Sequence, residues 1–120
     1  MENKMEQITI IINSGPYGTE SPYDALRLAV TLNKDEVRVN VFLLADGVWA
    51  GQAGQSVPQG YYNIERMLQM LLSSGSKVKA CGTCMTARGL DEGKLIKGVE
   101  KATMADLAQW VRKSKKVLCF

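Results

Sequence analysis

The stretch of sequence that decides the fold is Gln7-Ile8-Thr9-Ile10-Ile11-Ile12-Asn13. A short, continuous run of apolar, β-branched residues predicts a strand that is buried on both faces. Strands of this kind occur at the centre of parallel sheets, because helices cover both faces of such sheets. We therefore expect this strand to be central and parallel.

The segments that follow alternate between helix and strand. A turn-rich loop over residues 13–19 precedes a helix that we expect Ser21 to cap, with Pro22 at its first position. The helical spacing of its apolar residues predicts an inward face made of Tyr23, Leu26, Ala29, Val30 and Leu32. A second strand over residues 37–44 is broken by Asp46-Gly47, and residues 48–59 are interpreted as a long loop, with partial helix as the alternative.

The second half of the chain continues the alternation. We expect a helix from about residue 59 to residue 74, a strand over 77–80, and a short helix over 92–97. The inward face of the first of these helices is predicted to contain Tyr61, Ile64, Met67, Leu68, Leu71 and Leu72. A last helix, capped by Thr103, should point Met104, Leu107, Ala108 and Val111 inward with Trp110 beside them, before a final strand over 116–120 in which Cys119 is packed away.

This alternation predicts an α/β fold with three layers: a mainly parallel sheet of about five strands and helices on both of its faces. The chain has 120 residues, 46% of them hydrophobic and 22% charged, which fits a single globular domain over residues 1–120. The N-terminus is too polar for a signal peptide and no apolar run is long enough to cross a membrane, so we expect a cytoplasmic protein with no membrane partner.

The net charge of +3 does not by itself indicate a nucleic-acid partner. The basic residues cluster only in Arg112-Lys113-Ser114-Lys115-Lys116, and we interpret this cluster as a solvated helix end because cations favour helix C-termini. No row of aromatic residues accompanies the cluster to stack on bases. We therefore expect no direct binding of nucleic acid.

The segment most suited to carry a reaction is Cys81-Gly82-Thr83-Cys84, which directly follows the third strand. Parallel sheets bind their ligands at the carboxyl ends of strands, so both thiols are candidate site residues. The chain contains three cysteines and no histidine. A zinc site within one chain would lack ligands, although a site shared between subunits stays open, and a Cys-His hydrolase is excluded. We expect no metal and no cofactor.

Three interpretations of the two thiols remain. They form a dithiol redox pair, although the sequence context of thioredoxin is missing. Alternatively, one of them is a thiolate that reacts directly with sulfur and needs no general base, and Arg88 is the candidate cation that stabilises it. In the third, both are small buried structural residues. The turn-like sequence between and after the cysteines favours function over structure.

Other motifs carry weaker signals. Gly15-x-x-Gly18 is compatible with a phosphate-binding loop but matches neither the dinucleotide nor the P-loop pattern. Asp46 is either a polar group of a site or part of a turn. The aromatic residues Trp49, Tyr61 and Tyr62 flank the long loop and suit either an oligomer surface or the core.

The sequence resembles the DsrE/DsrF-like sulfur-relay family, which includes the TusD-type subunits of the tRNA-thiolation relay. The resemblance covers essentially the whole chain. It is carried by residues 13–20, 25–29 and 44–48 and, most specifically, by Ala80-Cys81-Gly82-Thr83-Cys84-Met85-Thr86-Ala87-Arg88-Gly89-Leu90. It implies a flavodoxin-like sheet, assembly into homotrimers or homohexamers, and a cysteine that carries sulfur as a persulfide.

By this resemblance, Cys81 matches the cysteine that accepts sulfur, because it stands at the family's distance from Arg88-Gly89. Arg88 and local backbone amides would stabilise its thiolate, and Cys84, a thiol that many TusD-type subunits lack, would be a resolving or second carrier thiol. The expected function is a persulfide carrier or sulfurtransferase with sulfur-donor and sulfur-acceptor proteins as partners. The alternatives are a dithiol redox protein and a non-catalytic oligomeric binding module that uses residues 15–19 and the long loop.

Overall fold

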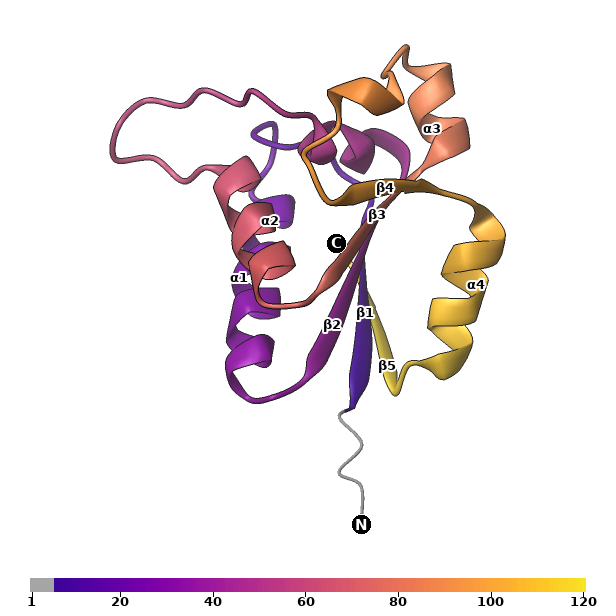
Figure 1. Cartoon of the computed structure of the whole chain (residues 1–120). Coiled ribbons are helices and arrows are strands. Elements are labelled where there is room, and N and C mark those ends of the chain that lie inside the picture. Colours follow the sequence, from indigo (N-terminus) through magenta and orange to yellow (C-terminus); the bar gives the residue numbers. More distant parts are fainter. Residues whose placement is uncertain (1–5) are drawn as a thin grey trace.

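Five parallel strands form one sheet in the computed structural model, which describes residues 6–120 (Figure 1). The strands are β1 (Gln7–Ile12), β2 (Arg38–Leu43), β3 (Lys77–Cys81), β4 (Val99–Ala102) and β5 (Lys116–Cys119). Most of the polar N-terminal segment that argued against a signal peptide, residues 1–5, lies outside the described part. Within the described part, no helix has the length and apolar character that crossing a membrane requires.

The helices occupy the connections between the strands. They are α1 (Ser21–Lys34), α2 (Ile64–Ser73), α3 (Gly82–Ala87) and α4 (Met104–Lys113), with two short 3₁₀ helices, η1 (Ala45–Gly51) and η2 (Glu92–Lys94). Figure 1 shows α1 and α2 on one face of the sheet and α4 on the other. The predicted α/β class and its three layers are therefore confirmed.

The strand order β4-β3-β2-β1-β5 places β1 between two parallel neighbours, as its sequence predicted. Ile10 pairs with Val41 on one side and with Leu118 on the other. Five of the six residues of β1 are buried, and Ile10 and Ile12 are fully inaccessible. On the α4 side, the Trp110 ring meets Phe42 of β2 edge-to-face at a centroid distance of 6.0 Å. These contacts make β1 and β2 the centre of the core.

The first two helices do not begin where the sequence indicated: α1 begins one residue earlier and α2 several residues later. The N-cap of α1 is Glu20, whose side chain makes no capping bond, so Ser21 is the first helical residue and not the cap. Helix α2 begins at Ile64, because Gly60 takes a left-handed conformation (φ 89°) and Asn63 then caps the helix by accepting a hydrogen bond from Arg66 N. Tyr61 therefore lies in the preceding loop, where it is 71% exposed, and its predicted inward position is wrong.

The last helix is rotated relative to the prediction. Thr103 caps α4 as expected, in a capping box with Asp106. However, Met104, Ala108 and Val111 are exposed, and the buried contacts come from Leu107 and Trp110. The large Trp110 ring, which packs on Phe42, determines which side of the helix faces the sheet. The basic cluster lies at the end of α4, as predicted, with Arg112 and Lys113 in the last turn.

The two edges of the sheet account for the remaining differences. The sequence did not locate β4, because this short edge strand has exposed Glu100 and Lys101 at its centre and reads as a loop. Cys119 was expected to be packed away, but it is exposed because β5 is the other edge strand. The predicted short helix over 92–97 is present only as the single turn η2.

Candidate thiol site at the carboxyl end of β3

Strand β3 passes into helix α3 without a loop, so that Cys81 is both the last residue of the strand and the N-cap of the helix. Gly82 at this junction lies close to β4: a Cβ atom there would be 2.9 Å from Cε of Lys101, so a larger residue would require that flexible side chain to shift. The segment that looked like a turn in the sequence is therefore the first turn of a helix. It lies at the carboxyl edge of the parallel sheet, where α/β proteins bind ligands.

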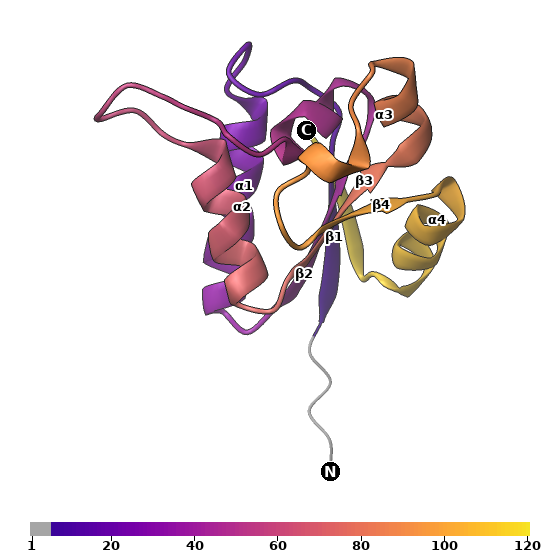
Figure 2. The ribbon, with the colours of Figure 1, turned by 45° about the horizontal axis from the view of Figure 1, so that its top comes forward.

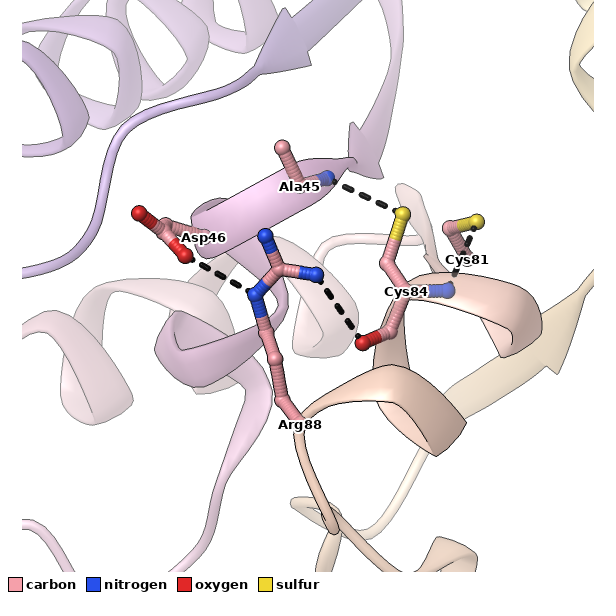
Figure 3. Close-up of polar contacts among 5 residues, drawn as sticks. All are labelled: Ala45, Asp46, Cys81, Cys84 and Arg88. Carbon is pink, nitrogen blue, oxygen red and sulfur yellow. Dashed lines mark hydrogen bonds and ion pairs between the residues drawn. The ribbon is translucent and has the colours of Figure 1, made fainter.

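The Cys81 side chain is almost enclosed, with only 5% of the residue exposed. Its Sγ atom accepts a hydrogen bond from the backbone N–H of Cys84 at 3.4 Å (Figure 3). Cys81 therefore combines a hydrogen-bonded sulfur atom with little access to solvent.

Cys84 is half-buried, and its Sγ atom accepts a hydrogen bond from the backbone N–H of Ala45 at 3.2 Å. Burial and hydrogen bonding with the Cys81 side chain raise the pKa of Cys84. The Ala45 amide and the positive charge of Arg88 act in the opposite direction but do not reverse the shift. Cys84 is therefore a protonated thiol at neutral pH.

The Ala45 amide is held in place by a tight turn at the end of β2. Ala45 itself has a left-handed backbone (φ 52°), which is uncommon for a residue with a side chain. Two residues later, a Cβ atom on Gly47 would collide with the carbonyl group of Ile12 on β1. Only glycine fits at this position, and the turn is consequently fixed against the carboxyl end of β1.

Arg88 links this turn to α3. Its Nε atom donates to Oδ1 of Asp46 at 2.8 Å, and its terminal Nη1 donates to the carbonyl oxygen of Cys84 at 3.1 Å (Figure 3). The structure thus brings together all three site residues predicted from the sequence, and Asp46 is the additional polar residue. Arg88 holds α3 to η1, and its charge favours the thiolate form of Cys84 without a direct hydrogen bond to the sulfur.

Cys119 does not join this site, since strands β1 and β2 separate β5 from β3 in the sheet. Among residues 6–120, there is no group of three or more His, Cys, Asp or Glu side chains arranged to hold a metal ion.

An open groove of about 740 Å³ lies beside the turn over residues 81–84, which we call the cysteine turn. It is formed by one side of α3 and by the junction of β4 with α4, and its polar lining includes Thr83, Thr86, Glu92 and Lys101. None of these four residues was predicted from the sequence, because the groove depends on β4, a strand that the sequence pattern does not reveal.

The comparisons with known proteins agree with this architecture. The model of the DsrE/DsrF-like family matches residues 6–120. "Protein YchN" of Escherichia coli strain K12 is 43% identical over 118 residues, which cover 97% of this chain and 100% of YchN. "Uncharacterized protein MK0008" of Methanopyrus kandleri is 44% identical over 116 residues, covering 97% of this chain and 95% of that protein.

Solved structures share this fold. The crystal structure of YchN from E. coli superposes with a TM-score of 0.91 over 97% of this chain and 100% of that chain. A protein of Methanobacterium thermoautotrophicum, MTH1491, shares the fold with a TM-score of 0.71 at 17% identity, over 92% of this chain and 96% of that chain. With a family model and relatives that span nearly its whole length, this chain belongs to the DsrE/DsrF-like family.

Proposed function

We propose that this protein is a sulfur carrier of a cytoplasmic sulfur relay, in which Cys81 holds sulfane sulfur as a persulfide. The observation that carries the proposal is the position of Cys81, at the end of β3 with a backbone N–H directed at its sulfur, in a member of the DsrE/DsrF-like family. Its partners would be a protein that donates sulfur and a protein that accepts it. Family membership supports a role related to sulfur relay.

The transfer needs no histidine, because a thiolate attacks sulfur directly. The Cys81 thiolate attacks the terminal sulfur of a donor persulfide. A new S–S bond forms at Cys81, the S–S bond of the donor breaks, and the donor cysteine leaves as a thiolate. In the second step, a thiolate of the acceptor attacks the outer sulfur of the Cys81 persulfide, and Cys81 leaves as a thiolate. Neither step requires an external oxidant or reductant.

Cys84 controls how long the sulfur stays in place. A Cys84 thiolate that attacks Sγ of a Cys81 persulfide forms a Cys81–Cys84 disulfide and expels hydrosulfide. In this reaction the two cysteines are oxidised and the sulfane sulfur is reduced. The raised pKa of Cys84 keeps it protonated at neutral pH and so slows the discharge. The same thiol can act as the resolving group when sulfide release is required.

This mechanism requires that the cysteine of a partner protein can reach the sulfur atom of Cys81. With 5% of the residue exposed, the sulfur leaves little room for the cysteine of a donor protein. Transfer therefore requires α3, a helix of six residues, to shift relative to η1. The Arg88–Asp46 ion pair, which joins these two elements, would resist that shift until a partner binds.

Mass spectrometry of the intact protein after incubation with a persulfide donor tests the proposal. Wild type should gain about 32 Da, one sulfur atom, and Cys81→Ser should not. Cys119→Ser is the matched control, since Cys119 is exposed but lies on a different strand, and it should load like wild type. Loading of Cys81→Ser at the wild-type rate would rule out Cys81 as the carrier.

A dithiol redox protein is the second candidate, favoured by the contact between the two cysteines in the first turn of α3. Treatment with oxidised glutathione, without any sulfur donor, tests this second function. A redox pair should form a Cys81–Cys84 disulfide and lose about 2 Da, the mass of two hydrogen atoms.

We also propose that the protein assembles into a homotrimer or homohexamer. Met104 and Val111 are 58% and 40% exposed on α4, and no strand within residues 6–120 pairs with the outer side of β5, so both elements offer surfaces that a second copy can cover. Light scattering coupled to gel filtration would measure the mass of the assembly. A monomeric mass at micromolar concentration would contradict this assembly and leave the thiol chemistry untouched.

A further inference from the structure

Three tyrosines form a column at the end of the molecule where α1 and α2 begin. The rings of Tyr23 and Tyr62 stack with their centroids 4.0 Å apart and their planes at 13°. The Tyr17 ring lies on Tyr62 at 5.8 Å and 15°. They come from three segments: the loop after β1, helix α1, and the loop before α2, which lie at the same end of the structure in Figure 2.

One part of this column already holds a cation. The guanidinium carbon of Arg27 lies 5.3 Å from the centroid of the Tyr23 ring. The same guanidinium forms an ion pair with Asp24, with 3.4 Å between Nη1 and Oδ1. An aromatic face attracts a cation through its quadrupole, and a nearby carboxylate adds the opposite charge. Tyr23 and Asp24 thus make a small guanidinium site that the chain fills itself.

The other part of the column has the same chemical groups. A groove of about 650 Å³, a volume typical of ligand sites, is lined by Tyr17, Tyr61, Tyr62 and Glu20. Among the described residues that line it, Glu20 alone carries a charge. Within residues 6–120, neither an ion pair nor a cation–π contact involves Glu20 or these three rings. The groove therefore offers aromatic side chains and a carboxylate without a cation from the chain.

The groove is built rigidly. Tyr17 has a left-handed backbone (φ 67°), which is strained for a bulky residue and persists only where the surroundings enforce it. Its hydroxyl group donates to Oε1 of Gln55 at 2.6 Å and accepts from the backbone N–H of Ile64 at 2.9 Å. The carboxylate of Glu65 accepts hydrogen bonds from the backbone N–H groups of Gly54 and Gln55. These bonds fix the long loop to the start of α2 and position the ring of Tyr17.

We propose that this groove binds a guanidinium cation, with the planar group against the rings of Tyr17 and Tyr61 and its charge paired with Glu20. The cation would be either a small guanidinium compound or an arginine side chain of a polypeptide, which present the same group. The site is separate from the cysteine turn. Its occupation does not depend on sulfur chemistry at Cys81.

Titration with N-acetyl-arginine amide, followed by NMR at low ionic strength, tests the proposal. The ring signals of Tyr17, Tyr61 and Tyr62 should shift and saturate. The citrulline analogue, which has nearly the same shape but no charge, should cause no saturable shift. Glu20→Gln should weaken binding about threefold or more, while Glu100→Gln, an equal loss of charge on β4, should not change it.

Two further variants separate a binding role of the aromatic face from a structural one. Tyr61 is 71% exposed, so both Tyr61→Phe and Tyr61→Leu should fold. Phe keeps the ring face and should retain binding, whereas Leu should weaken it. Equal responses to the arginine and citrulline probes, or unchanged affinity in Glu20→Gln, would overturn the proposal.

The source of the cation is distinguished with a short peptide that contains one arginine. Affinity about tenfold higher than for the amide would indicate a polypeptide ligand, and equal affinity a small molecule. In every arm, sulfur loading of Cys81 should be the same in Glu20→Gln as in wild type, so that failure of this site and failure of the carrier function remain distinguishable.

Discussion

Arg88 and Asp46, 42 positions apart in the sequence, form an ion pair of 2.8 Å that joins α3 to η1. The same guanidinium donates to the carbonyl oxygen of Cys84, so that one side chain connects the two segments that surround the thiols. The Asp46 side chain is 66% exposed and that of Arg88 is 29% exposed. Solvent screens such a pair, so it adds little to global stability. It positions Cys84, and the charge of Arg88 slightly lowers the pKa of that thiol.

Replacement of Arg88 by methionine should accordingly change chemistry more than stability. We expect the free energy of unfolding to fall by about 1 kcal/mol or less, the range of exposed ion pairs. The pKa of Cys84 should rise further, because the charge of Arg88 lowers it in wild type. The rate of alkylation by iodoacetamide as a function of pH, measured in the Cys81→Ser, Cys119→Ser background, reports this pKa. Arg112→Met, at the solvated end of α4, is the control and should leave the profile unchanged.

The lifetime of a Cys81 persulfide should depend on pH through Cys84. Because the pKa of Cys84 is raised, its thiolate becomes abundant only above the pH range of an ordinary cysteine. Sulfide release from the loaded protein should therefore be slow at neutral pH and rise steeply in alkaline solution. In Cys84→Ser the rise should disappear. A pH-independent release that is the same in both proteins would show that Cys84 does not discharge the persulfide.

Gly47 should tolerate no side chain. In Gly47→Ala the new Cβ atom meets the carbonyl group of Ile12, a backbone group that cannot move aside without disturbing β1. We expect a loss of about 3 kcal/mol in the free energy of unfolding, at the upper end for overpacked sites. Urea denaturation measures it. Gly93→Ala is the matched control, because a Cβ there contacts nothing within 4 Å, and it should change stability by less than about 0.5 kcal/mol.

The capping box of α4 should make stability depend on pH in the acidic range. Hydrogen bonds from the backbone and side chain of Thr103 lower the pKa of Asp106 in the folded protein. A carboxyl group with a lowered pKa stabilises the fold above its unfolded pKa and loses that contribution as the pH falls through the folded value. Asp106→Asn should therefore lower Tm at neutral pH and have little effect once wild-type Asp106 is protonated. Calorimetry at several pH values would detect this, and an equal difference in Tm at all of them would contradict it.

The sequence predicted the fold class from features that are local. The isoleucine run of β1 identified the central parallel strand, and the alternation of elements identified the layers. It failed where tertiary contacts decide the outcome. The orientation of α4 depends on Trp110 packing against Phe42, a residue 68 positions away, and β4 is a strand because β3 pairs with it.

The candidate site was predictable to a similar degree. The spacing of Cys81 and Cys84 and the nearby Arg88 were visible in the sequence, and the structure brings all three together. Two contacts of the site were not visible in the sequence: the hydrogen bond from the amide of Ala45 to Cys84 and the ion pair between Asp46 and Arg88. Both depend on how the chain folds after the end of β2. The 5% exposure of Cys81 also has no counterpart in the sequence pattern.

The junction of β3 and α3 has one further consequence. Because the sulfur of Cys81 accepts a backbone hydrogen bond of the helix that follows it, the atom that would gain cargo is also part of the scaffold. Any chemical change at that atom alters the hydrogen bond that starts α3, and with it the surface that α3 presents. A partner that contacts only this short helix could thereby distinguish a carrier loaded with sulfur from an empty one without contacting the sulfur itself.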